Sequence, residues 1–372
     1  MTSRNCHLIA LILLCFSGLY PGASAQTAPS AIPNQIQREV QPNLSVDRDP
    51  IVSPDPADNA PTSPALAKAA TQPTTTEKKQ DIYTFQADVD EVLLNCTVVD
   101  EKGQLAMDLN RGDFRVWEDN VPQTIASFQH QDLPVSMGIL VDNSGSMRDK
   151  RAAVNAAAMD LIRASNPQDA AFIVNFSDEA YIDQDLTSNL VALERGLSHV
   201  DSRGSTALYD AVAASANELS RHAKQPKQAL LIITDGEDNA SRLNLQQTIR
   251  RVQGLGGPVV YSIGLLFDNP NKDKAQRARE ALERLSQETG GLAYFPQSLE
   301  DVDRIAREVA RDIRNQYTIG YHSTKPASLG GYRLVRVEAS SSKHRKLIVR
   351  TRNGYYPKQA QHTHTETAQK AQ

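Results

Sequence analysis

Cysteine is scarce in this chain, which limits how the folded protein can be stabilised. Of its three cysteines, Cys6 and Cys15 fall in an amino-terminal segment that we expect to be removed, so only Cys96 remains. A single thiol cannot form an internal disulfide, and stability must therefore come from packed cores. Cys96 lies on the apolar side of a predicted strand, where the expected role is that of a small core residue.

A long apolar run is also missing. The longest, residues 8–19, is shorter than the roughly 18 residues that a membrane-spanning helix needs. Arg4 precedes this run and the small residues Ala23-Ser24-Ala25 follow it, which is the pattern of a secretory signal peptide cleaved after Ala25. We therefore predict a signal peptide over 1–25, no transmembrane segment in the mature chain, and a secreted or periplasmic location.

Excess positive charge is absent too. The chain has 40 Lys and Arg against 44 Asp and Glu, a formal net charge of −4. This mild acidity gives no electrostatic basis for binding nucleic acid or an anionic membrane. Residues 26–80 are rich in Pro, Ala, Thr and Gln, and they contain too few bulky apolar residues to offset the entropy of ordering. We predict a disordered linker there and a disordered polar tail over 358–372.

The segment 133–314 has the alternating pattern of an α/β domain. Its apolar runs of strand length are 135–141, 170–176, 229–234, 258–266 and 292–295. Helical periodicity follows or separates these runs at 149–165, 205–222, 244–254, 274–289 and 299–314. This alternation predicts a doubly wound, mostly parallel sheet with helices on both faces, similar to a Rossmann fold. Residues 180–186 are the exception, because they follow the strand ending at Phe176 closely enough to form an antiparallel edge hairpin.

Strand patterns of period two flank this domain. They occur at 92–99, 114–117 and 124–128 on one side, and at 316–321, 332–339 and 346–351 on the other. Neither set has enough strands for an independent core. We therefore predict that 81–132 and 315–357 are the two halves of one small antiparallel β-sandwich, with the α/β domain inserted between them.

Oxygen-bearing side chains gather where the strands of the α/β domain end. Asp142, Ser144 and Ser146 follow the first buried strand, Asp235 follows the strand at 229–234, and Thr206 lies in a loop that enters a helix. The carboxyl ends of strands in an open doubly wound sheet form a binding crevice. Two carboxylates and three hydroxyls are suited to a hard cation, Mg²⁺ or Mn²⁺, and a cation held partly by neutral hydroxyls favours an incoming carboxylate.

These motifs resemble a known family. The sequences DNSGS at 142–146, GSTALYDAV at 204–212 and TDGEDN at 234–239 are similar to the metal-ion-dependent adhesion site of von Willebrand factor type A domains, which include the integrin I domains. The resemblance implies that Asp142, Ser144, Ser146, Thr206 and Asp235 bind the metal, and that the protein is a non-enzymatic adhesion module that engages an acidic group of a protein partner. The flanking segments, including Asp113-Phe114-Arg115-Val116-Trp117, resemble a secreted family of related proteins common in acidobacteria.

Two other functions stay open. A hydrolase would need a base beside Ser144 or Ser146, yet the only histidines of 133–314, His199 and His222, lie away from the strand ends. No phosphate-binding GxxxxGK[ST] or GxGxxG run occurs after the first strand either. A structural module whose metal merely ties loops together is the second alternative. Glu237, Asp238 and Asn239, beyond Asp235, are expected to form a solvated loop.

Overall fold

The computed structural model describes residues 44–46, 91–198 and 202–357. The predicted signal peptide, the tail and all of the predicted linker except 44–46 lie outside these ranges. Among the described residues, no helix combines the length and apolarity needed to cross a membrane.

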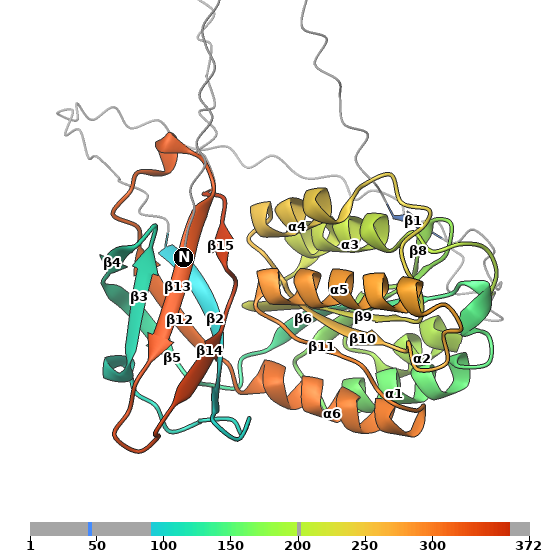
Figure 1. The fold of residues 1–372 in the computed structure, drawn as a ribbon, viewed down its shortest axis with the longest axis horizontal. Helices are drawn as coiled ribbons and strands as arrows, with labels where there is room; N and C mark the ends of the chain where they lie inside the picture. Colours follow the sequence, from blue (N-terminus) through green and yellow to red (C-terminus); the bar gives the residue numbers. More distant parts are fainter. Residues whose placement is uncertain (1–43, 47–90, 199–201, 358–372) are drawn as a thin grey trace, which may run out of the picture. The chain divides into compact units, whose positions relative to one another are not determined.

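A seven-stranded sheet forms the centre of the α/β domain (Figure 1). Its order is β1-β8-β7-β6-β9-β10-β11, and neighbouring strands are parallel except β7 and β8. The strands are β1 (Ser45–Val46), β6 (Val135–Asp142), β7 (Ala170–Phe176), β8 (Ala180–Thr187), β9 (Lys227–Thr234), β10 (Val259–Gly264) and β11 (Ala293–Tyr294). Every residue of β6, β7 and β10 is buried, as expected for parallel strands covered on both faces.

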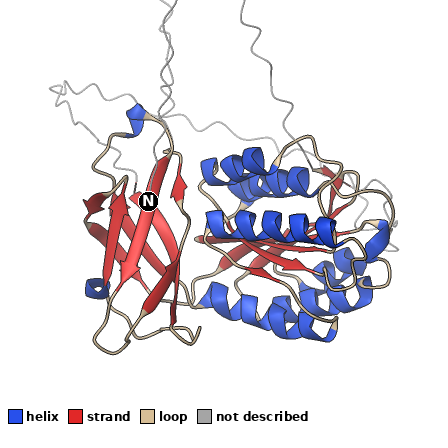
Figure 2. Ribbon diagram, in the orientation of Figure 1, coloured by secondary structure: helices blue, strands red, loops and turns tan. Residues whose placement is uncertain are grey.

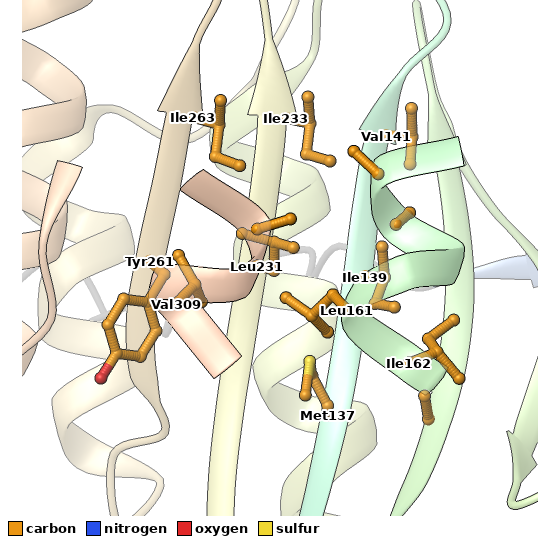
Figure 3. Close-up of a cluster of buried hydrophobic side chains, with 14 of the residues drawn as sticks. Met137, Ile139, Val141, Leu161, Ile162, Leu231, Ile233, Tyr261, Ile263 and Val309 are labelled. Atoms are coloured by element: carbon orange, nitrogen blue, oxygen red, sulfur yellow. The ribbon is translucent and has the colours of Figure 1, made fainter. Parts of the chain in front are cut away.

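Helices cover both faces of this sheet (Figure 2). One face packs against α1 (Arg151–Arg163), α2 (Leu190–Ser198) and α6 (Glu300–Arg314). The other packs against α3 (Leu208–His222), α4 (Leu245–Gly254) and α5 (Lys272–Thr289). In α6 the buried side chains recur every three or four residues, so that one stripe faces the sheet. Figure 3 shows the first of these cores, where Leu161 of α1 and Val309 of α6 lie with Ile139, Leu231 and Tyr261 of the strands.

Two four-stranded antiparallel sheets make up the β-sandwich, in the orders β14-β2-β12-β5 and β15-β13-β3-β4. The strands before the α/β domain are β2 (Glu91–Asp100), β3 (Phe114–Glu118), β4 (Val121–Gln123) and β5 (Ile125–Gln129). Those after it are β12 (Tyr317–His322), β13 (Arg333–Ala339), β14 (Leu347–Arg350) and β15 (Gly354–Tyr355). The two sets interleave, since β12 and β14 pair with β2 and β13 pairs with β3. The predicted fold class, an α/β domain inserted into an antiparallel β-sandwich, is thus confirmed.

Both sheets of the sandwich share one apolar core. Cys96 of β2 and Val116 of β3 are buried in it together with Ile319 of β12 and Val335 of β13. The Cys96 thiol has no exposed surface, and burial raises its pKa to about 12. Residues from both sides of the insertion contribute, so neither half of the sandwich has a complete core without the other.

One ion pair crosses this core. Arg333 Nη1 lies 3.2 Å from Glu118 Oε1, and the two side chains are 1% and 2% exposed. Ser323 donates a hydrogen bond to Glu118 Oε1, and the hydroxyls of Tyr321 and Tyr355 each donate one to Oε2 at 2.8 Å. The hydrogen bonds join β3, which precedes the α/β domain, to three strands or turns that follow it.

Several short elements were not predicted from the sequence. These are α2, β4, β15 and the two-residue strand β1. The hairpin of β7 and β8 is antiparallel as predicted, but it does not form the edge, because β1 pairs in parallel with β8 on its outer side. Ser45–Val46 of the predicted linker thus belong to the sheet, and Leu44 packs against the core on the α3 face.

We expect the α/β domain to become more stable as the pH rises from 7.5 to 9.5. Lys227, at the start of β9, is buried, and desolvation lowers its pKa from 10.5 to about 8. Between these values the unfolded chain binds a proton that the folded chain has released, so the free energy of unfolding increases with pH, by about 1–2 kcal/mol over this interval. Urea unfolding, monitored by the circular dichroism of the helices at each pH, measures this increase in the free energy of unfolding.

Lys227→Met removes the titrating group and should abolish this rise. Lys272→Met, at an exposed lysine of α5, is the matched control and should keep it. An equal rise in wild type and Lys227→Met would contradict the assignment.

Candidate metal centre

The site begins where β6 and β9 end. These strands are parallel neighbours, with Val141 opposite Ile233, so Asp142 and Asp235 leave the sheet at the same edge. The hydroxyl of Thr234 donates a hydrogen bond to Asp142 Oδ2 at 2.5 Å, which fixes the first carboxylate against the end of the neighbouring strand. The register of two buried strands thus brings together residues that are far apart in the sequence.

Asp142 is a desolvated carboxylate. It has no exposed surface, and its Oδ1 accepts a hydrogen bond from the Ser144 backbone N–H at 2.8 Å. Burial raises the pKa of Asp142 to about 6; the hydrogen bonds from Thr234 and Ser144 oppose this rise, and the charge of Asp235 adds to it. A buried carboxylate beside a second one gains free energy when a cation binds between them.

Serine hydroxyls connect this carboxylate to the second one. Ser144 Oγ lies 3.3 Å from Ser146 Oγ, and Ser146 donates a hydrogen bond to Asp235 Oδ1 at 2.8 Å. Asp142, Ser144 and Asp235 are buried, whereas Ser146 is exposed. The group of side chains is therefore anchored in the protein and open to solvent on the Ser146 side.

Thr206 reaches the same place from the loop before α3. Its backbone N–H donates to Asn239 Oδ1 at 2.9 Å, and its carbonyl accepts from Asn239 and Ala240 at 3.0 and 3.2 Å. A Cβ atom added to Gly236 would lie 3.5 Å from Thr206 Oγ1, so the hydroxyl faces the turn that directly follows Asp235. The structure thus places the five predicted residues on three loops that adjoin one another.

The donor chemistry of this group fits a hard divalent cation. All five side chains offer oxygen, which Mg²⁺ and Mn²⁺ prefer. Among the described residues, no three His, Cys, Asp or Glu side chains gather into a metal-binding group. A cation here would therefore depend on the hydroxyls as well as on the two carboxylates.

Lys150 is a member of this site that sequence reasoning missed. Its Nζ lies 2.6 Å from Asp235 Oδ2 and 2.9 Å from Oδ1 of Asp268, in the loop between β10 and α5. Burial favours the neutral amine, but the hydrogen bonds to both carboxylates outweigh it and raise the pKa of Lys150. Lys150 stands at the N-cap position of α1 without a capping hydrogen bond, where the helix dipole disfavours a cation, but its position in the sequence does not indicate its partners.

The loop after Asp235 braces the site and is only partly solvated. Asp238 accepts hydrogen bonds from the Tyr209 backbone N–H at 3.0 Å and from the Ser241 hydroxyl at 2.5 Å. Asn239 holds Thr206, and Glu237 pairs with Arg277 at 2.7 Å. Asn239 is exposed, as expected for a solvated loop, whereas Asp238 is half-buried, and the side chains of both fix the loops that carry Thr206 and α3.

Comparison with known families gives a match over the strands that build this site. Residues 137–237 match the family model described as von Willebrand factor type A domain. The α/β domain has the von Willebrand factor type A fold. The match includes Asp142, Thr206 and Asp235 and leaves the β-sandwich outside, so the similarity of the flanking segments to the secreted acidobacterial family stays a prediction.

Solved structures resemble the type A domain at low sequence identity. The conserved hypothetical protein BatB from Bacteroides thetaiotaomicron is 16% identical over 48% of this chain and 98% of its own, with a TM-score of 0.38. A von Willebrand factor type A protein from Catenulispora acidiphila is 14% identical over 73% of this chain and 74% of its own, with a TM-score of 0.41. The pilus adhesin SpaC from Lactobacillus rhamnosus GG is 12% identical over 64% and 47%, also at 0.41.

No curated protein matches the sequence. Because the TM-scores of the solved structures lie below 0.5, we draw no function from them.

Proposed function

We propose that the type A domain is an exported, non-enzymatic adhesion module that holds an acidic group of a partner protein through one divalent cation, Mg²⁺ or Mn²⁺. The observation that supports this most directly is the pair of buried carboxylates, Asp142 and Asp235, at adjacent strand ends, bridged by serine hydroxyls and open at Ser146. Asp142, Ser144, Ser146, Thr206 and Asp235 would hold the cation. When bound, the cation supplies the positive charge that attracts and coordinates a carboxylate of the partner protein.

Neutral hydroxyls matter for this function. Three of the five oxygen donors carry no charge, so they hold a cation without neutralising it. The Lys150 ammonium, which shares Asp235, lowers the negative charge of the site further. The two aspartates just balance the charge of a divalent cation, and because the hydroxyls add no further negative charge, the cation can still accept a carboxylate from an acidic partner as a ligand.

The contacts of the two serines argue against a hydrolase. Their hydroxyls contact each other, and that of Ser146 contacts Asp235, while the backbone N–H of Ser144 donates to Asp142. Asp235 is ion-paired with Lys150, and a carboxylate held by an ammonium is a poor general base. A structural metal that only joins the loops remains the competing function, and it differs in one respect, because it needs no partner.

A pull-down of the partner protein distinguishes the adhesion function from a purely structural metal. The immobilised protein, incubated with secreted and envelope fractions of its source, should retain a partner in Mg²⁺ and release it when a chelator is added. Asp142→Ala should retain none, since it removes a carboxylate that holds the cation. Asp149→Asn, at an exposed acid in the same loop, is the matched control and should behave as wild type.

The nature of the contact is tested on the captured partner itself. Converting its exposed carboxylates to amides with a carbodiimide should abolish retention, whereas acetylating its lysines should not. A partner held equally in Mg²⁺, in chelator and by Asp142→Ala would exclude a bridging metal. Metal binding without any Mg²⁺-dependent partner would favour the structural function.

A further inference from the structure

Lys150 holds the same carboxylate that the proposed cation needs. Both oxygens of Asp235 are engaged, Oδ1 by the Ser146 hydroxyl at 2.8 Å and Oδ2 by the Lys150 ammonium at 2.6 Å. The side chain of Asp235 is 2% exposed and that of Lys150 is 9% exposed, so water screens this pair little. An ammonium and a divalent cation would compete for this carboxylate at short range.

The ammonium also has a second partner that lies outside the predicted ligand set. Asp268 Oδ1 is 2.9 Å from Lys150 Nζ, and the Asp268 side chain is 50% exposed. Because a lysine ends in a flexible four-carbon chain with three donors, it can keep one carboxylate while giving up another. Asp268, in the loop between β10 and α5, can therefore keep the ammonium paired when Asp235 is no longer its partner.

We propose that Lys150 is an internal competitor of the divalent cation at Asp235, and that Asp268 is the carboxylate that retains its ammonium when the cation takes Asp235. Lys150 then sets the metal affinity of the site, and Asp268 limits how strongly it competes. This inference rests on the proposed metal function and adds a determinant of affinity that the five oxygen donors alone do not include.

A purely structural brace predicts something different. If Lys150 and Asp268 only shaped the loops around Asp235, removing either one would loosen the ligand set and weaken metal binding. If Lys150 competes, the two substitutions act in opposite directions, because one removes the competitor and the other removes its alternative partner. The sign of the change therefore distinguishes the two roles.

Calorimetric titration of the full chain with Mg²⁺ and with Mn²⁺ tests this. We expect Lys150→Met to bind both ions about tenfold more tightly or better, since a close, buried charge pair no longer has to be broken. Asp268→Asn should bind them about three- to tenfold more weakly, since the ammonium is left with Asp235 alone. Asp273→Asn, at an exposed acid in the first turn of α5, is the charge-matched control and should bind as wild type.

Thermal unfolding gives a second readout that does not depend on heat of binding. In chelator, Lys150→Met should unfold at a lower temperature than wild type, because Asp235 loses its counter-charge, and Mg²⁺ should stabilise it by more than it stabilises wild type. Should Lys150→Met fail to fold, Lys150→Gln provides the same test, because it removes the ammonium charge and keeps a long polar side chain that can still donate a hydrogen bond to Asp235.

The outcomes separate this inference from the proposed function. Wild type that binds Mg²⁺ while Lys150→Met binds no more tightly, or Asp268→Asn no more weakly, overturns the competition and leaves the metal function intact. Binding by Lys150→Met alone supports the competition and overturns the metal function of the natural chain. No binding by any of these proteins overturns both.

Discussion

Glu118→Gln should lower the free energy of unfolding of the β-sandwich by about 3–5 kcal/mol, the usual cost of leaving one member of a buried ion pair without its partner. The carboxylate of Glu118 accepts hydrogen bonds from Ser323, Tyr321 and Tyr355 in addition to its contact with Arg333. An amide can accept at only one of its two positions, so two tyrosine hydroxyls or the arginine would lose an acceptor. The Arg333 guanidinium would stay buried as an uncompensated charge.

The single tryptophan of the chain makes this measurable. Trp117 precedes Glu118 in β3, so its fluorescence during urea unfolding follows the sandwich, while helical circular dichroism follows the type A domain. Glu338→Gln is the matched control, since Glu338 is 55% exposed and its ion pair with Arg336 should contribute less than about 1 kcal/mol. If the two substitutions cost the same, the buried pair is not a main support of the sandwich.

Asp142→Asn should abolish the stabilisation of the type A domain by Mg²⁺ without lowering its stability in chelator. The amide oxygen can still accept from the Ser144 backbone N–H, and the amide NH2 group can donate to the Thr234 hydroxyl instead of accepting from it, so both contacts of the side chain are kept. The raised pKa of Asp142, about 6, indicates that burial of its charge opposes folding, and a neutral amide removes that cost. The metal loses an anionic ligand that an amide cannot replace in charge.

The size of the effect follows from mass action. At a Mg²⁺ concentration one hundred times the Kd, a ligand that binds only the folded state adds about 2.7 kcal/mol, and Asp142→Asn should lose nearly all of it. Unfolding followed by helical circular dichroism, with and without Mg²⁺, measures both quantities. Equal stabilisation of wild type and Asp142→Asn would show that Mg²⁺ binds elsewhere.

The long, uniformly apolar strands were predictable because burial on both faces leaves a simple pattern. Residues 170–176 were expected as a strand and form β7 over the same range. The short elements could not be predicted from the sequence, because contacts with other parts of the fold determine them. Strand β4 is three residues long and contains Pro122, and it exists because Asp119 and Asn120, with φ of 47° and 65°, form a two-residue turn that returns the chain beside β3.

The same distinction applies to the metal centre. Asp142 and Asp235 could be placed because each directly follows a recognisable strand, and the edge at which parallel strands end is fixed by the fold. Lys150 and Asp268 could not, because they are 118 positions apart and their contact depends on the paths of two loops. Sequence periodicity contains no information about such a loop-to-loop contact.

The buried thiol of Cys96 has a practical consequence. It is the one cysteine among the described residues, it has no exposed surface, and its raised pKa keeps it protonated in the folded sandwich. A thiol-specific reagent can therefore modify it only in molecules whose sandwich has opened. The rate of labelling reports how often the two chain segments on either side of the inserted domain come apart, under native conditions and without denaturant.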